Sequence, residues 1–114
     1  MHEAAVAQDL VDVICQEATK QGARPITAKM SCGQLNAVND EVLSFAFEAI
    51  AKGTVCEGMD LRIEHKPMQA RCSQCEGTYE LKLTETQCPH CGSEDFQLLP
   101  DAPLVLEEIE FEKE

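Results

Sequence analysis

Four cysteines in two C-x-x-C pairs constrain this chain more than any other feature of its sequence. Cys72 and Cys75 form the first pair, Cys88 and Cys91 form the second, and residues 76–87 lie between them. Two such pairs on a short connection supply the four soft ligands that a zinc ion takes in tetrahedral geometry. A redox-active pair or an iron–sulfur cluster is the weaker alternative. The four cysteines are therefore predicted to bind one zinc ion.

The predicted zinc site is structural, because four thiolates leave no coordination position for water or a substrate. Gly77 and Gly92 follow the two pairs, where a tight turn around a metal-bound sulfur favours a residue without a Cβ atom. Tyr79, Leu81 and Leu83 alternate between the pairs and are expected to form one arm of a connecting hairpin.

The composition supports a role for a metal and excludes several classes of protein. Only 4% of the 114 residues are aromatic and none is Trp, so the hydrophobic core must be small. A net charge of −12 repels the phosphate backbone, so we expect no nucleic-acid partner. The chain shows no secretory signal and no apolar run long enough to span a membrane. Seven cysteines are an odd number for a disulfide scaffold, which favours the reducing cytoplasm.

Hydrophobic periodicity predicts two helices and three strands outside the cysteine-rich segment. The expected order is a helix over 4–21, a strand over 26–32, a helix over 40–52, a strand over 61–66 and a last strand after Pro103. Asn39 is the expected N-cap of the second helix. The fold class is therefore α/β, with two helices packed on a three-stranded sheet and an inserted zinc-ribbon module. We expect residues 1–67 plus 101–114 to form the α/β domain and residues 68–100 the zinc-binding domain.

Apolar residues at helical or alternating spacing predict which faces are buried. On the helices these are Val6, Leu10, Val13, Ile14, Ala18, Val42, Leu43, Ala46, Phe47 and Ile50. On the strands these are Ile26, Ala28, Met30, Cys32, Leu61, Ile63, Val105, Ile109 and Phe111. Leu104 and Leu106 have the opposite parity to the last three. Phe45 cannot face the same way as Phe47, so it is expected to be partly exposed or to contact the insert.

The cysteines and histidines elsewhere in the chain have simple structural interpretations. Cys15, Cys32 and Cys56 are expected to be small buried hydrophobic residues. His65 shares the parity of a strand's apolar face, which favours a packed and hydrogen-bonded histidine over a metal ligand. His90 lies between two of the zinc cysteines, where it is expected to be exposed or to donate a hydrogen bond to the metal centre.

The amino terminus carries a second possible metal site. The α-amine of Met1, the backbone nitrogen of His2 and the His2 imidazole can close adjoining chelate rings on one metal ion. Nitrogen ligands in a plane are what Ni(II) or Cu(II) prefers, and Glu3 can add a backbone nitrogen or a carboxylate oxygen. By itself a histidine at position two is weak evidence for a metal site, since such a residue is usually just solvated at the terminus.

Several segments together resemble the HypA/HybF family of hydrogenase maturation nickel metallochaperones. They are Met1-His2-Glu3 before an amphipathic helix, Phe45-Ala46-Phe47-Glu48, Lys52-Gly53-Thr54, Glu57-Gly58 and the C-x-x-C and C-P-x-C-G motifs of the insert. The similarity extends over nearly the whole chain. The zinc motif alone is common, but its combination with an amino-terminal M-H-E sequence is specific.

The resemblance implies a nickel site at Met1, His2 and Glu3 and a structural zinc at the four cysteines. It also implies two partners, a GTPase hydrogenase maturation factor of the HypB type and the large subunit of a hydrogenase. An acidic residue at the start of the second helix has been linked to nickel in some family members. Asp40 occupies that region here, and we do not include it in the predicted site.

Two functions remain open at the level of sequence. The first is a nickel metallochaperone that binds Ni(II) at its N-terminus and helps deliver it to the large subunit of nickel–iron hydrogenase. The alternative is a zinc-ribbon protein-interaction module without a cargo metal, in which His2 has no role. An enzyme is disfavoured, because the chain has no phosphate-binding loop and no nucleophile–base pair at recognisable spacing.

Overall fold

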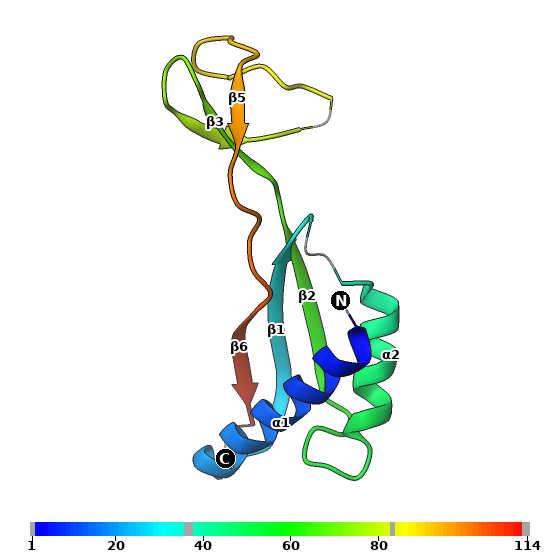
Figure 1. The fold of residues 1–114 in the computed structure, drawn as a ribbon. Helices are drawn as coiled ribbons and strands as arrows, with labels where there is room; N and C mark the ends of the chain where they lie inside the picture. Colours follow the sequence, from blue (N-terminus) through cyan, green and yellow to red (C-terminus); the bar gives the residue numbers. More distant parts are fainter. Residues whose placement is uncertain (1, 36–37, 83, 113–114) are drawn as a thin grey trace.

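The computed structural model describes residues 2–35, 38–82 and 84–112 and shows two lobes along one long axis. The molecule measures 54 × 29 × 18 Å along its principal axes. Figure 1 shows the larger lobe with both helices at one end and a small β lobe at the other, joined by two extended segments.

The larger lobe has the α/β architecture that the sequence predicts. Its elements are α1 (Glu3–Gln21), β1 (Pro25–Gly33), α2 (Asp40–Ala51), β2 (Asp60–Lys66) and β6 (Val105–Phe111). The sheet order is β2-β1-β6, with β1 parallel to β2 and antiparallel to β6. Ala28, Met30 and Cys32 lie on one face of β1 and belong to the same hydrophobic cluster as residues of both helices. The two helices therefore cover one face of the sheet.

Helix α1 buries a stripe that shares Leu10, Ile14 and Ala18 with the predicted one. It ends before Gly22, which adopts the left-handed conformation with φ 62°. Its buried residues are Ala7, Leu10, Val11, Ile14 and Ala18. The prediction for Val13 is wrong, because Val13 lies to the side of this stripe and is 44% exposed.

Helix α2 begins at the predicted cap and has one buried and one apolar exposed face. The Oδ1 atom of Asn39 accepts a hydrogen bond from the backbone N–H of Val42 at 3.0 Å, and this pairing satisfies one free N–H of the first turn. Leu43 and Phe47 are buried in the core. The prediction for Val42 is wrong, since it is 50% exposed, and Phe45 is 76% exposed.

A bulge in β6 explains why its apolar residues change parity. Lys29 pairs with Glu108 but the next residue, Met30, pairs with Leu106, so Glu107 is an extra residue in β6. The bulge allows both Leu106 and Ile109 to pack on the core. Val105 is consequently exposed, contrary to the prediction.

Two predictions for β1 are also wrong. Pro25 pairs with Phe111 and Thr27 with Glu110, so Ile26 is an unpaired residue and is 40% exposed. Ser31 alternates with the apolar residues of this strand and should therefore lie on its open face, but it is buried.

The bulged Glu107 covers Ser31. The Ser31 hydroxyl donates a hydrogen bond to Glu107 Oε1 at 2.5 Å, and Lys66 Nζ lies 3.1 Å from the same oxygen. The Ser31 hydroxyl and the Lys66 ammonium together lower the pKa of Glu107.

The small lobe extends from the end of the sheet where β1 and β2 finish. Gly33 N–H donates to the carbonyl of Ala102 at 3.0 Å, and Leu35 N–H donates to Asp101 Oδ2 at 2.9 Å. These bonds hold the segment that returns from the small lobe against the turn after β1. The chain thus leaves and re-enters the larger lobe at one place.

The small lobe is a three-stranded antiparallel sheet with few buried residues. Its strands are β3 (Gln69–Cys72), β4 (Thr78–Glu80) and β5 (Phe96–Leu98), in the order β4-β3-β5. The buried residues of its hydrophobic cluster are Ala70, Cys72, Tyr79 and Cys88. Leu81 packs against this cluster, and Leu83 of the predicted hairpin arm lies outside the described residues. Within the described part of the chain, neither helix is long and apolar enough to cross a membrane.

The two faces of α2 should respond differently to truncation. Leu43→Ala removes a fully buried side chain and should lower the free energy of unfolding by about 2–5 kcal/mol. Phe45→Ala, on the exposed face of the same helix, should change it by less than about 0.5 kcal/mol. Urea unfolding followed by far-UV circular dichroism measures both. Equal losses in the two variants would contradict the packing described here.

Candidate metal centres

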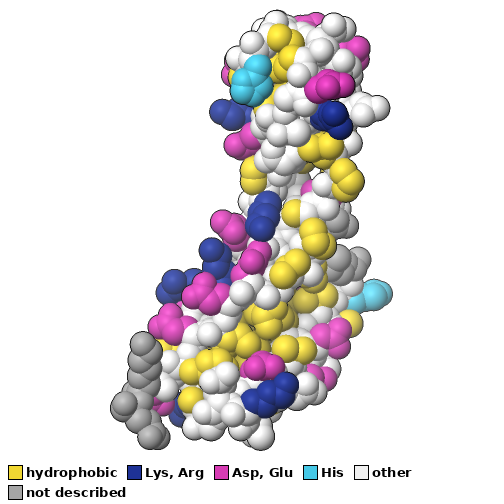
Figure 2. All heavy atoms as spheres, turned by 90° about the vertical axis from the view of Figure 1, so that its left-hand side faces the viewer, with side chains coloured by type: hydrophobic (Ala, Val, Ile, Leu, Met, Phe, Trp, Pro, Cys, Tyr) yellow, Lys and Arg dark blue, Asp and Glu magenta, His cyan; other side chains and the backbone are white. Residues whose placement is uncertain are grey.

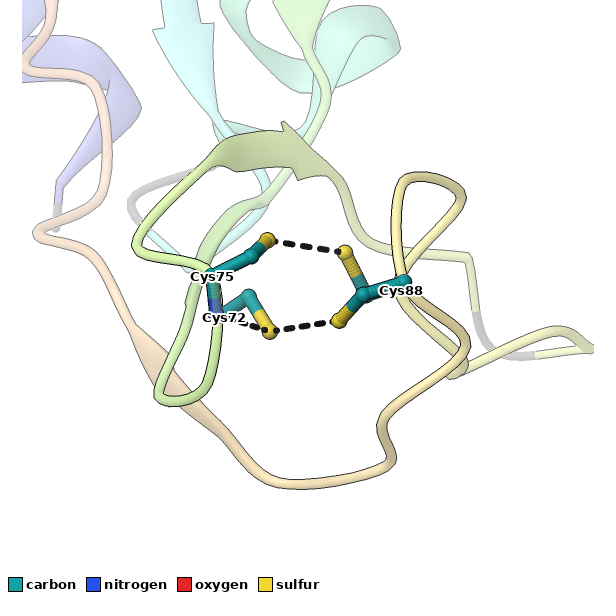
Figure 3. Close-up of side chains that lie close together, drawn as sticks. Cys72, Cys75 and Cys88 are labelled. Carbon is teal, nitrogen blue, oxygen red and sulfur yellow. Dashed lines mark hydrogen bonds between the residues drawn. The ribbon is translucent and has the colours of Figure 1, made fainter.

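The four predicted zinc cysteines come together at the far end of the small lobe. All four Sγ atoms lie within 4.8 Å of one another. Cys72 Sγ is 3.5 Å from Cys91 Sγ, and Cys75 Sγ is 3.7 Å from Cys88 Sγ. Figure 3 shows the sulfur atoms of the first pair facing those of the second across a small gap. The thiols from two distant turns thus form one compact group of donors.

The two C-x-x-C turns repeat the same backbone arrangement. Glu76 N–H donates to the carbonyl of Cys72 at 3.0 Å, and Gly92 N–H donates to the carbonyl of Cys88 at 2.8 Å. Each turn also directs a backbone N–H toward its first sulfur, from Cys75 to Cys72 Sγ at 3.5 Å and from His90 to Cys88 Sγ at 3.4 Å. Such N–H groups stabilise negative charge on sulfur.

The glycines after the two pairs serve different purposes. Gly92 has φ 78°, as its place in the tight turn predicts. In the first turn the left-handed position is occupied by Glu76, with φ 63°, instead of Gly77. Gly77 leaves room for His90, because a Cβ atom there would lie 3.2 Å from Cδ2 of His90 and the ring would have to shift by a few tenths of an ångström. The His90 ring therefore packs against the opposite turn, close to Cys75.

The charges of the thiols favour a bound cation. Hydrogen bonding from the Cys75 backbone lowers the pKa of Cys72 to about 6, despite the opposing effect of burial. Hydrogen bonding from the Ser93 backbone also lowers the pKa of Cys91. The hydrogen bond with Cys72 and burial have the larger combined effect, however, and raise the pKa of Cys91 to about 12. Four thiolates repel one another unless a cation lies between them. A soft divalent ion bound by four sulfurs removes this repulsion, so the donor set fits zinc.

The predicted nickel site lies at the start of α1, in the other lobe. Met1 lies outside the described residues. His2 is the N-cap residue of α1, is exposed, and accepts a hydrogen bond from Val6 N–H on its carbonyl at 3.1 Å. Glu3 is the first residue of the helix. Because the first N–H groups of a helix have no acceptor within it, the backbone nitrogens of His2 and Glu3 are not needed for the fold.

His65 is hydrogen-bonded, as its strand position predicts, but it is exposed and not packed. The sequence did not identify its hydrogen-bond partners. Its Nε2 atom lies 2.6 Å from Asp40 Oδ1 at the start of α2, and its Nδ1 atom lies 3.6 Å from Cys32 Sγ. The contact with Cys32 follows from the sheet, since these two residues are direct partners between β1 and β2. The contact with Asp40 depends on where α2 packs, which periodicity alone does not determine.

These features together define a class of protein. The molecule is a small metal-binding protein, with a closed group of four thiols in one lobe and an exposed histidine at the amino terminus of the other.

Comparison with known proteins identifies the family. The family described as "Hydrogenase/urease nickel incorporation, metallochaperone, hypA" matches residues 1–111. Hydrogenase maturation factor HybF of Escherichia coli K12 is 34% identical over 113 residues, covering 98% of this chain and all of that protein. Hydrogenase maturation factor HypA of Aeromonas salmonicida is 33% identical over 111 residues, covering 96% and 98%. The chain belongs to the HypA/HybF family of nickel metallochaperones for hydrogenase maturation, which are not catalytic enzymes.

Two solved structures share the fold. The solution structure of the Ni metallochaperone HypA from Helicobacter pylori superposes with a TM-score of 0.63 at 22% identity, covering all of both chains. A second solution structure of a HypA protein gives a TM-score of 0.71 at 22% identity, covering 100% of this chain and 98% of the other.

Loss of one thiol should remove zinc from the small lobe and unfold it, and should leave the larger lobe folded. Cys91→Ser should lower the zinc content from one equivalent per chain to well below one and unfold the small lobe, because folding and metal binding are coupled there. The helical signal should persist, since α1 and α2 have their own core. Elemental analysis and far-UV circular dichroism measure the two effects. Cys15→Ser is the matched control and should retain one zinc; a full equivalent in Cys91→Ser would contradict the four-thiolate assignment.

Zinc binding should also weaken as the pH falls. Protons compete with zinc for the thiolates, so acidification favours the metal-free form. The pKa of the Cys72 thiol is lowered to about 6, so without zinc this thiol should stay ionised to a lower pH than an ordinary thiol. Competition with a chromophoric chelator between pH 5 and 8 measures the affinity, and a constant affinity over this range would exclude thiolate ligands.

Proposed function

We propose that this chain binds one Ni(II) ion at Met1, His2 and Glu3 and helps deliver it to the large subunit of a nickel–iron hydrogenase. The observation that carries the proposal is the position of His2, exposed at the first turn of α1. An imidazole next to the free α-amine and two unused backbone nitrogens offers the planar nitrogen ligands that Ni(II) prefers. The family to which the chain belongs is one of nickel metallochaperones, which supports this choice of metal.

The position at a helix terminus determines what kind of ligands the metal requires. The amino-terminal end of a helix is positively polarised and disfavours a cation. A bound Ni(II) ion therefore needs ligands that carry negative charge, which deprotonated backbone nitrogens and the Glu3 carboxylate supply. Forming these ligands releases protons, so nickel affinity should decrease as the pH is lowered.

The zinc proposed for Cys72, Cys75, Cys88 and Cys91 has a structural role. The small lobe buries few residues and depends on the metal for its order. The nickel ligands belong to residues 1–67 plus 101–114 and the zinc ligands to residues 68–100, and we propose these ranges as separate domains. Cargo can then bind and leave without disturbing the structural metal.

The proposed partners are a GTPase maturation factor of the HypB type and the hydrogenase large subunit, and the proposed location is the cytoplasm. Membership of the hydrogenase maturation family supports a place in the nickel insertion pathway. The reduced thiols of the proposed zinc site favour the cytoplasm. A net charge of −12 favours partners with basic surfaces over nucleic acid.

Substitution of the amino-terminal histidine should remove nickel and spare zinc. His2→Ala deletes an exposed imidazole, so the thermal midpoint should hardly change and one zinc should remain. Nickel affinity should fall at least about 100-fold, because the chelate loses its side-chain ligand. Isothermal titration of untagged, zinc-loaded protein measures this, with His90→Ala as the histidine control that keeps nickel binding.

An amino-terminal extension distinguishes the metallochaperone from an interaction module without cargo. Extending the chain before Met1 converts the α-amine into an amide and should abolish tight nickel binding. Nickel binding that survives both the extension and His2→Ala would overturn the proposed site. The interaction-module interpretation would then be the better one.

A further inference from the structure

We propose that Cys15 and Cys56 form an intramolecular disulfide when a hydroperoxide reaches the larger lobe. Their Sγ atoms lie 3.6 Å apart, although the residues are 41 positions apart in the sequence. Cys15 belongs to α1, and Cys56 lies in the loop between α2 and β2. Neither residue belongs to the group of four thiols in the small lobe.

The two thiols differ in access and in chemistry. Cys15 is partly exposed, whereas Cys56 is buried. Burial, reinforced by the hydrogen bond with Cys15, raises the pKa of Cys56 to about 11, so its thiol remains protonated at neutral pH. Cys15 is therefore the residue that a small oxidant meets first, and Cys56 is the resolving thiol beside it.

A hollow borders the loop that carries Cys56. It has a volume of about 440 Å³ and is lined by Cys56 together with residues at the end of α2 and the start of β2, including Phe47 and Leu61. Cys56 itself is fully buried, so an oxidant reaches the pair at the partly exposed Cys15.

The chemistry balances with hydrogen peroxide as the oxidant. The Cys15 sulfur attacks one peroxide oxygen, the O–O bond breaks, and Cys15 sulfenic acid and one water are formed. The Cys56 sulfur then displaces the sulfenic oxygen, which leaves with the Cys56 proton as a second water. Two thiols are oxidised by two electrons, and one peroxide is reduced to two waters. A dithiol reductant reverses the reaction by exchange.

The loop that carries Cys56 can adjust to the shorter bond. A disulfide requires the sulfur atoms to approach to about 2.05 Å. Residues 52–58 form consecutive turns outside the sheet, so side-chain rotation and a small loop shift suffice. Cys32 differs, because it lies in the central strand and its Sγ contacts His65. The cross-link would join α1 to the loop after α2 and restrict the unfolded chain.

To test this proposal, the zinc-loaded protein is treated with one equivalent of hydrogen peroxide. Remaining thiols are alkylated under denaturing conditions, and the protein is digested without reduction. We expect a mass decrease of about 2 Da in the intact protein and a linked peptide pair containing Cys15 and Cys56. Zinc content should stay at one equivalent. The thermal midpoint of the larger lobe should rise by about 5 °C or more, and dithiothreitol should reverse the rise.

Single substitutions make the assignment specific. Cys15→Ser and Cys56→Ser should each abolish the linked peptide and the rise in the thermal midpoint, whereas Cys32→Ser, the matched control, should retain both. The measurement on the parent protein does not depend on any variant folding. Failure to form the linked peptide, oxidation of Cys15 beyond the sulfenic acid, or disulfides of Cys72, Cys75, Cys88 or Cys91 with loss of zinc would overturn the proposal.

Discussion

Strand β1 determines the arrangement of the whole molecule, because it pairs in parallel with β2 and antiparallel with β6. The chain therefore leaves β2 and enters β6 at the same end of the sheet. The small lobe therefore lies beyond that end, away from both helices (Figure 1). Figure 2 shows the result as a narrow upper part rising from a broad base on which hydrophobic side chains gather. The small lobe has few buried residues of its own, so we propose that a metal ion bound by the four converging thiols provides what a hydrophobic core provides elsewhere.

Much of the fold could be predicted, because element type depends on periodicity and end signals that are local in sequence. The cap at Asn39 and the order of helices and strands are examples. The wrong predictions on the strands occur where pairing with a neighbouring strand overrides the local pattern. The bulge at Glu107 changes the parity of β6, an unpaired position in β1 exposes Ile26, and the Glu107 carboxylate covers Ser31. A bulge depends on the partner strand, so alternation within one strand cannot reveal it.

The candidate sites likewise contain some features that the sequence predicts and others that it does not. The spacing of two C-x-x-C pairs predicts that four thiols converge, since each pair forms one turn and a hairpin brings the turns together. The same pattern did not predict that Glu76, instead of Gly77, adopts the left-handed conformation. The contact between Cys15 and Cys56 has no sequence signal, because it depends on how α1 packs against the loop after α2. The proposed amino-terminal site is local to three residues, and its proposed preference for nickel follows from the chemistry of its nitrogen atoms.

We propose that one chain holds two metals in chemically different sites, one in each lobe. X-ray absorption at the nickel and zinc edges of untagged protein, loaded with one equivalent of each metal, tests this most directly. We expect only nitrogen and oxygen ligands around nickel, including an imidazole, and four sulfur ligands at about 2.3 Å around zinc. Sulfur in the first coordination shell of nickel, or nitrogen among the zinc ligands, would contradict it.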